Sequence, residues 1–245
     1  MNEELLKILL KDRTTGKNIL WANAEFGAKE IQPEQTHLIE PRCQKNREQQ
    51  KQRTRDRAEI FTPPDICAMQ NDLLWKKRES WTEYVDAKFL EIACGEAPYL
   101  VSRYNAVTGD DIQLDKRIGL LDRKLRLVSK HTDNVNDWLR WAGVALCSVY
   151  GYEFQGDNLF LARQNILLSF NEYFEEKFPT ARLSDKILCS VAEIISWNLW
   201  QMDGRTGSPP FTENANLFGG ANCKIIDWRT GKVVEFKSLL GEKQL

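Results

Sequence analysis

The sequence predicts an α/β fold with a mostly parallel sheet and helices on both faces of that sheet. Two segments, Lys88–Ala93 and Ser148–Glu153, have the length and composition of buried strands. Apolar residues at helical spacing lie between them and after the second one. Strands that alternate with helices favour a parallel sheet over an antiparallel one.

The residues after the first strand predict a cofactor-binding corner. Gly95 permits a tight turn, and Pro98 is placed in the first turn of the helix expected next. A strand, a tight turn and a helix N-terminus form the usual binding corner of an open α/β sheet. The second strand ends in the acidic Glu153, and Asp157 is placed to cap the helix that follows.

Other helices are predicted from caps and apolar spacing. Thr62 is placed as an N-cap with Pro63 in the first turn and Asp65 at the capping-box position, and the buried stripe of this helix would be Ile66, Met69 and Leu73. Leucines near the N-terminus also have helical spacing. The spacing predicts two helices over 114–128 and 135–142.

Composition narrows the class of protein. The 245 residues are 42% hydrophobic and 28% charged, which is ordinary for a globular protein. No apolar run reaches the roughly 18 residues of a membrane span, and the acidic N-terminus is unlike a signal peptide. Six cysteines without a CxxC pair and only two histidines favour neither a disulfide framework nor a metal site. We therefore expect a cytoplasmic protein with reduced cysteines.

Two similar strings, Asp12–Lys17 and Asp227–Lys232, share the pattern D-x-x-T-G-K and predict turns of small hairpins near the two ends of the chain. Convergent turn chemistry accounts for so short a match better than a duplication does. The predicted organisation is an N-terminal extension over 1–57 and a main domain over 58–245.

The segment Arg42–Arg57 is strongly basic although the whole chain, with 34 Lys and Arg against 35 Asp and Glu, is nearly neutral. Such a run is often only a solvated helix or a linker. Clustered cations also displace counterions from nucleic acid, so the segment is a candidate DNA-binding element. Its cations are Arg42, Lys45, Arg47, Lys51, Arg53, Arg55 and Arg57.

Three motifs occur in a meaningful order: Phe61-Thr62-Pro63, Phe89–Gly95 (FLEIACG) and Tyr152–Asn165 (YEFQGDNLFLARQN). Together they resemble the S-adenosylmethionine-dependent amino-methyltransferases of DNA, especially the modification subunits of bacterial restriction systems. The resemblance covers about residues 58–168. It implies a Rossmann-like methyltransferase fold with S-adenosylmethionine as cofactor.

The resemblance also implies roles for individual residues. Glu91 would pair with the methionine ammonium, and Gly95 would let the backbone approach the ligand. Glu153 would take the two ribose hydroxyls, and Phe154 would lie against the adenine ring. The remaining implied cofactor-binding residues are Phe61, Thr62, Pro63, Ala93 and Cys94.

The sequence departs from the family pattern at three places. Ala97 stands where the family has a second glycine, and Glu96 adds a negative charge beside the expected cofactor. The long interval from Gly95 to Glu153 requires a helical insertion, at about 105–147. A doubly wound domain with the same turns and no cofactor is the alternative interpretation.

Amino-methyltransferases carry a [D/N/S]-P-P-[Y/F/W] loop after a strand, and Ser208-Pro209-Pro210-Phe211 fits this pattern. In the family, the polar side chain and a proline carbonyl accept hydrogens from the target amine, and the aromatic ring stacks on the flipped base. The preceding candidate strand is Ile194–Trp197. A second alignment places Asn198–Gln201 at the loop position, and a plain turn at 208–211 is a third interpretation.

A competing pattern occurs near the C-terminus, where Asp227 and Glu235-Phe-Lys237 flank the predicted hairpin. Restriction nucleases hold a metal with an Asp on one strand and a Glu-x-Lys on the next, and such carboxylates can activate water through magnesium. Alternating charged residues on a surface hairpin are the simpler explanation.

Two functions follow as hypotheses. The first is transfer of a methyl group from S-adenosylmethionine to the exocyclic amine of a DNA base, with adenine as the expected target, in a restriction-modification system. Carbon-5 cytosine enzymes need a Pro-Cys nucleophile, and the chain has no such dipeptide. The second is a catalytically inactive protein of the same fold that binds DNA or a restriction-modification partner, as a regulator or a phage-borne decoy. The first also allows a separate specificity or restriction subunit.

Overall fold

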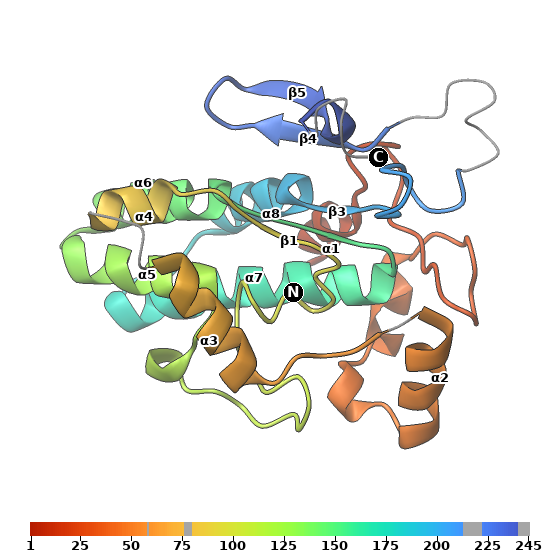
Figure 1. Cartoon of the computed structure of the whole chain (residues 1–245). Helices are drawn as coiled ribbons and strands as arrows, with labels where there is room; N and C mark the ends of the chain where they lie inside the picture. The colour runs from red at the N-terminus through yellow and green to blue at the C-terminus, as the bar shows by residue number, and fades with distance from the viewer. Residues whose placement is uncertain (58, 76–79, 213–221, 240–245) are drawn as a thin grey trace.

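The computed structural model describes residues 1–57, 59–75, 80–212 and 222–239, which form an α/β fold (Figure 1). Short strands alternate with helices as the sequence predicts. The described helices are α1 (Glu3–Leu10), α2 (Arg47–Arg57), α3 (Pro64–Trp75), α4 (Trp81–Asp86), α5 (Leu120–His131), α6 (Val135–Cys147), α7 (Gly156–Lys177) and α8 (Asp185–Asn198). Short 3₁₀ helices span Pro33–Leu38, Arg42–Gln44, Leu114–Lys116 and Phe236–Leu239.

A three-stranded parallel sheet has the order β1 (Phe89–Glu91), β2 (Val149–Glu153) and β3 (Leu199–Gln201). In its register Glu91 lies beside Gly151, and Glu153 lies beside Gln201. The carboxyl ends of the strands therefore meet at one edge of the sheet. A separate antiparallel hairpin consists of β4 (Lys224–Asp227) and β5 (Lys232–Glu235).

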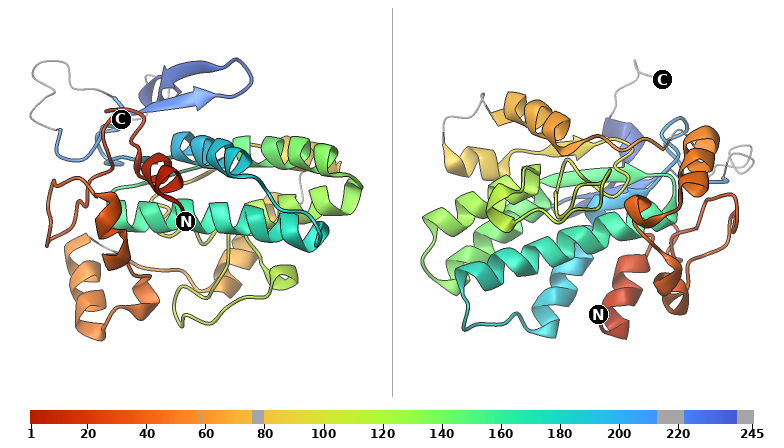
Figure 2. Two further views of the ribbon diagram at one scale, coloured as in Figure 1. Left: turned by 180° about the vertical axis from the view of Figure 1, so that it is seen from behind. Right: turned by 90° about the horizontal axis from the view of Figure 1, so that it is seen from below.

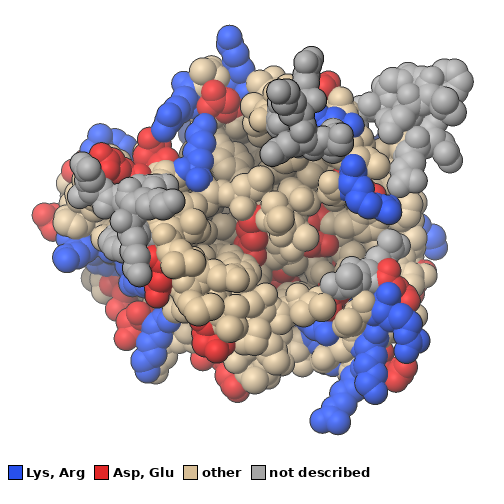
Figure 3. Space-filling view, in the orientation of Figure 1, with Lys and Arg blue, Asp and Glu red and all other residues tan. Residues whose placement is uncertain are grey.

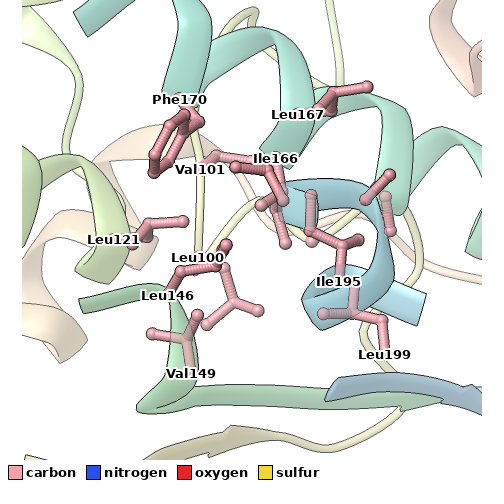
Figure 4. Close-up of a cluster of buried hydrophobic side chains, with 14 of the residues drawn as sticks. Leu100, Val101, Leu121, Leu146, Val149, Ile166, Leu167, Phe170, Ile195 and Leu199 are labelled. Carbon is pink, nitrogen blue, oxygen red and sulfur yellow. The ribbon is translucent and has the colours of Figure 1, made fainter. Parts of the chain in front are cut away.

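The helices cover one face of the parallel sheet. Val149 and Leu199 of the strands belong to the same buried cluster as Leu121, Ile166 and Ile195 of the helices. Figure 4 shows these side chains converging between the helices and the strands. This large apolar core is the main source of stability for the fold.

The second face of the sheet carries a different layer. Tyr150 and Trp200 project from β2 and β3 into a cluster with Ile225 and Phe236 of the C-terminal segment. The β4–β5 hairpin therefore covers this face in the described part of the chain. The prediction of helices on both faces is wrong there, because the sheet is short enough for a hairpin to cover its aromatic side chains.

The N-terminal extension is part of the same body. Leu9 and Leu10 of α1 are fully buried, and α1 lies against α7 and α8 (Figure 2). The two D-x-x-T-G-K strings form equivalent turns: Gly16 donates its N–H to the carbonyl of Asp12 at 2.9 Å, and Gly231 donates to Asp227 at 2.7 Å. The expected turn chemistry is thus present in both, and a hairpin follows the pattern near the C-terminus.

Several local predictions are wrong in informative ways. No helix follows Gly95; the chain runs in turns until Leu114, and α5 begins only at Leu120. The helix near Thr62 begins at Pro64, so Pro63 rather than Thr62 is at its N-cap position. Its expected buried stripe is exposed, with Met69 at 56% and Leu73 at 61%, because Cys67 and Asn71 face inward instead.

Ile194–Trp197 is helical rather than extended, since it forms part of α8, and the strand is the next segment, β3. Asp157 does not cap α7, whose N-cap is Gln155. The six cysteines are free thiols. None of the described helices combines the length with the apolar character that crossing a membrane requires.

Candidate functional site

An open cavity of about 760 Å³ lies at the carboxyl ends of β1 and β2. That volume lies within the range of small-molecule sites. Figure 3 shows Asp and Glu side chains inside a hollow near the centre of this face. Of the nine residues that the resemblance assigns to a cofactor, all except Pro63 line the cavity.

The structure brings the F-T-P segment against the turn after β1. A Cβ atom on Gly95 would lie 3.4 Å from the ring of Phe61, which is ordinary van der Waals contact. The left-handed backbone at position 95, with φ of +54°, is therefore what favours glycine there. Lack of space for a side chain is not the reason. Phe61, Thr62 and Gly95 form neighbouring parts of the cavity wall.

Every second residue in the turn after β1, at positions 93, 95 and 97, has a left-handed backbone conformation. Ala93 has φ +48° and Ala97 has φ +62°, so two non-glycine residues adopt the conformation that glycine prefers. This alternation keeps the chain from continuing into a helix at Pro98. The cavity consequently lacks the helix N-terminus that the sequence predicts directly after β1.

Glu153 is 7% exposed, and its carboxylate accepts three backbone hydrogen bonds. Gly95 donates to Oε2, and Phe154 and Gln155 donate to Oε1, each at 2.9 Å. Burial raises the pKa of Glu153, against these hydrogen bonds that favour the charged form. A carboxylate offers about four acceptor positions, so one remains for a ligand hydroxyl.

Glu91 is less satisfied than Glu153. Its Oε1 accepts the N–H of Tyr99 at 3.3 Å, whereas its buried Oε2 has no hydrogen-bond partner in the described chain. Burial, and then the charge of Glu153, raise the pKa of Glu91 to about 8. A cationic group in the cavity would relieve both effects, because it would supply the missing donor and an opposite charge.

Glu96 does not stand beside the cavity as expected. It is buried, and it accepts the backbone N–H of Arg42 at 2.7 Å and the hydroxyl of Tyr104 at 2.5 Å. The expectation of a charge next to the cofactor is therefore wrong. Glu96 instead joins the N-terminal extension to the loop after β1.

Glu59 is the main site residue that sequence reasoning missed. It is 7% exposed, and Arg42, Arg53, Gln155 and Asn158 all donate to its carboxylate at 2.7–3.0 Å. Burial opposes its ionisation, but the bonds from Arg53 and its neighbours lower the pKa. Its position two residues before Phe61 of the F-T-P motif is the one signal in the sequence.

The basic segment divides into internal and external cations. Arg53 pairs with Asp157 at 2.7 Å as well as with Glu59, and Arg42 also pairs with Glu59. Lys45 donates to the backbone carbonyl of Glu40. Arg47, Lys51 and Arg55 are exposed, and the side chain of Arg57 lies outside the described part of the chain.

The S-P-P-F segment lies beside the cavity rather than in its lining. Ser208 is 1% exposed, and its hydroxyl donates to the carbonyl of Thr206 at 3.5 Å. Pro209 and Pro210 are buried, whereas Phe211 is half exposed. The ring of Phe211 lies 5.9 Å, edge to face, from that of Phe154, which does line the cavity.

Two of the other interpretations fail, whereas a plain turn at 208–211 is compatible with the structure, in which Pro210 and Phe211 form a turn. Asn198–Gln201 cannot form the loop, because Asn198 ends α8 and the next three residues are β3. The nuclease pattern also fails, because the two acidic residues lie at opposite ends of the hairpin. In the strand register Asp227 lies opposite Lys232 at one end, and Glu235 lies opposite Lys224 at the other. No carboxylate, cysteine or histidine cluster suited to a metal occurs among the described residues.

Two residues of the A-R-x-N string have structural roles. Arg163 is fully buried and donates to backbone carbonyls of Leu9, Lys11, Ser196 and Leu199. Asn165 donates to the carbonyl of Glu96 and to the hydroxyl of Tyr104. These bonds join α7 to α1, α8 and the loop after β1.

The arrangement suits a ligand that is both cationic and polar, since the buried Glu153 and the partly buried Glu91 border one cavity with an aromatic ring nearby. No protein-family model matches the chain, and neither a curated protein nor a solved structure is detectably similar to it.

Proposed function

We propose that this protein binds S-adenosylmethionine in the cavity and transfers its methyl group to the exocyclic amine of a DNA base, with adenine as the target, in a restriction-modification system. The observation that carries the proposal is the unpartnered Oε2 of Glu91 at the end of β1. S-adenosylmethionine has an ammonium and a sulfonium, so a cavity lined by Glu91 and Glu153 favours it over an anionic nucleotide.

The residues present fit the rest of this molecule. Glu91 would hold the ammonium, and the remaining acceptor position of Glu153 would take a ribose hydroxyl. Phe154 offers a ring against which the adenine can stack. The chemistry that S-adenosylmethionine supplies when bound is an electrophilic methyl group on sulfur.

The target base would be held by the segment that follows β3. Phe211 is exposed and next to Phe154, so its ring is available for stacking on a base extruded from the duplex. Ser208 would accept a hydrogen from the target amine after its hydroxyl turns away from Thr206. The backbone carbonyl of Pro209 or Pro210 would accept the other hydrogen.

The test is transfer of a radiolabelled methyl group to unmethylated DNA. The wild-type protein is expected to label the DNA, and the double variant Ser208→Ala, Phe211→Ala is expected to lose this activity while still binding the cofactor. The control is Ser190→Ala, since Ser190 is an exposed residue of α8. Full activity in the double variant would refute the assignment of this loop.

A second candidate function is a catalytically inactive protein of this kind that binds DNA or a restriction-modification partner. The buried Ser208, with its hydroxyl donating to Thr206, favours it. The two candidates differ in one result. The inactive protein would bind DNA and transfer no methyl group, even with saturating cofactor.

A further inference from the structure

We propose that one flank of α2, formed by Arg47, Lys51 and Arg55, binds the sugar-phosphate backbone of duplex DNA beside the cavity. The inference rests on the proposed function, because an enzyme that modifies a base must hold the duplex next to its cofactor. Among the cations of the basic segment whose side chains the structure describes, these three are the exposed ones.

The interior contacts of α2 explain why it is a helix at all. Its sequence, REQQKQRTRDR, contains no apolar residue, so hydrophobic burial cannot fix it to the body. Polar bonds hold it instead: Arg53 reaches Asp157 and Glu59, and Thr54 donates to the carbonyl of Glu59 at 3.0 Å. A solvated helix or linker would not need this buried anchoring.

The two outer flanks of α2 differ in charge. On one flank Arg42, Arg47, Gln50, Lys51, Thr54 and Arg55 line a shallow hollow of about 440 Å³ that contains no acidic residue. On the other flank a hollow of about 300 Å³ contains more acidic than basic residues: Glu25, Glu40, Asp56 and Asp157 against Lys45 and Arg53, and Arg53 is already paired with Asp157. Only the first hollow suits a polyanion.

The three cations also match a linear partner. They are spaced four residues apart, so they share one face of the helix over about 12 Å. A DNA duplex carries about seven phosphate charges along that length. Arg47, Lys51 and Arg55 are exposed, and none of them forms an ion pair with a described residue. Arginine binds phosphate oxygens in a bidentate manner, which favours a phosphodiester backbone.

Glu59 fixes the distance between this flank and the cavity. Its carboxylate accepts bonds from Arg42 and Arg53 on the α2 side and from Gln155 and Asn158, which line the cavity. Figure 3 shows Lys and Arg side chains over the position of α2, on the same face as the acidic hollow. DNA held by α2 would therefore lie within reach of the cavity.

The experiment measures binding of a fluorescently labelled DNA duplex by anisotropy over a range of salt concentrations, with the full chain and no cofactor. The test variant is Arg47→Gln, Lys51→Gln, Arg55→Gln; glutamine keeps the helix propensity similar. The matched control is Lys116→Gln, Lys130→Gln, Arg182→Gln, which removes three exposed cations elsewhere. Circular dichroism melting checks that both variants remain folded.

The test variant is expected to bind at least about tenfold more weakly at about 0.1 M salt, and the slope of log K against log salt is expected to become shallower by about 2 to 3. The control should match the wild type. Equal affinity and slope in the test variant, an equal loss in both variants, or no binding of the duplex by the wild type would overturn the inference.

Calorimetry with S-adenosylmethionine separates this inference from the proposed function. The test variant should bind the cofactor as the wild type does, because none of its three substitutions lines the cavity. If both proteins bind the cofactor and the test variant binds DNA as the wild type does, only the assignment of DNA binding to α2 is refuted. If the test variant binds DNA more weakly and neither protein binds the cofactor, only the proposed methyltransferase function is refuted.

Discussion

Gly95 and Glu153, 58 residues apart in the chain, are joined by a hydrogen bond of 2.9 Å from the backbone N–H of Gly95 to Oε2 of Glu153. The carboxylate at the end of β2 thus holds the turn that follows β1. Both residues line the cavity, so its wall is fixed before any ligand binds. Such preorganisation lowers the cost of ordering the site on binding.

This bond predicts a stability cost for Glu153→Gln. The carboxylate accepts three backbone N–H groups, and an amide has only one oxygen, so at least one buried donor loses its acceptor. We expect the free energy of unfolding to fall by about 1–3 kcal/mol in urea titrations. Glu176→Gln, at an exposed position, should change it by less than about 0.5 kcal/mol. Equal stability of the two variants would contradict the structural role of Glu153.

Glu91 predicts a pH dependence of stability. Its pKa is raised to about 8 in the folded protein, so between the unfolded value, near 4.5, and about 8 the folded state holds a proton that the unfolded state has lost. Stability is therefore greatest below the lower value and decreases as the pH rises through 8.

Glu91→Gln removes this effect, so the free energy of unfolding of the variant should increase relative to that of the wild type as the pH rises. The expected gain is on the order of 4 kcal/mol between pH 5 and pH 8.5. Urea titrations of both proteins at several pH values measure it, without added ligand. Parallel pH curves for the two proteins would show that Glu91 is ionised normally in the folded state.

The left-handed backbone at Ala93 predicts a stabilising substitution. Ala93 is exposed and has φ +48°, so Ala93→Gly removes steric strain without loss of buried surface. We expect a gain of about 1 kcal/mol, seen as a higher melting temperature. Ala68→Gly inside α3 is the opposite control and should cost about 1 kcal/mol. A loss of stability at position 93 would mean that the turn does not adopt this backbone conformation.

Because the carboxylate of Glu59 binds Arg42 and Arg53, we expect the stability of α2 to depend on Glu59. In Glu59→Gln, Arg42 loses its ionic partner and Arg53 keeps only Asp157. We expect a loss of about 3 kcal/mol and faster amide hydrogen exchange in α2. Glu48→Gln, an exposed change on the same helix, should do neither. Unchanged exchange in α2 after the loss of Glu59 would show that other contacts hold the helix.

Sequence patterns predicted the parts of the fold that depend on local chemistry. The strands that contain Glu91 and Glu153, the α6 and α7 helices and both D-x-x-T-G-K turns follow from apolar spacing and turn residues. The α8 error has a known origin: a short apolar run such as Ile194–Trp197 fits a buried helix and a strand equally well.

The remaining features depend on contacts between distant residues. Nothing local indicates that Arg53 pairs with Asp157, 104 positions away, so the sequence predicted a solvated helix, a linker or a DNA-binding element without separating its buried cations from its exposed ones. The helix expected after Gly95 is absent because Ala93 and Ala97 have left-handed backbone conformations, which an alanine in the sequence does not predict. The exposed stripe of α3 reflects the inward position of Asn71, which donates to the carbonyls of Tyr99 and Ile118.

The most direct test of the central claim is titration calorimetry of the full chain with S-adenosylmethionine, for the wild type and Glu91→Gln. The account predicts binding by the wild type and at least about tenfold weaker binding by the variant, because the amide cannot offer a negative charge to the ammonium. No measurable binding by the wild type, or equal affinity in both proteins, would contradict it.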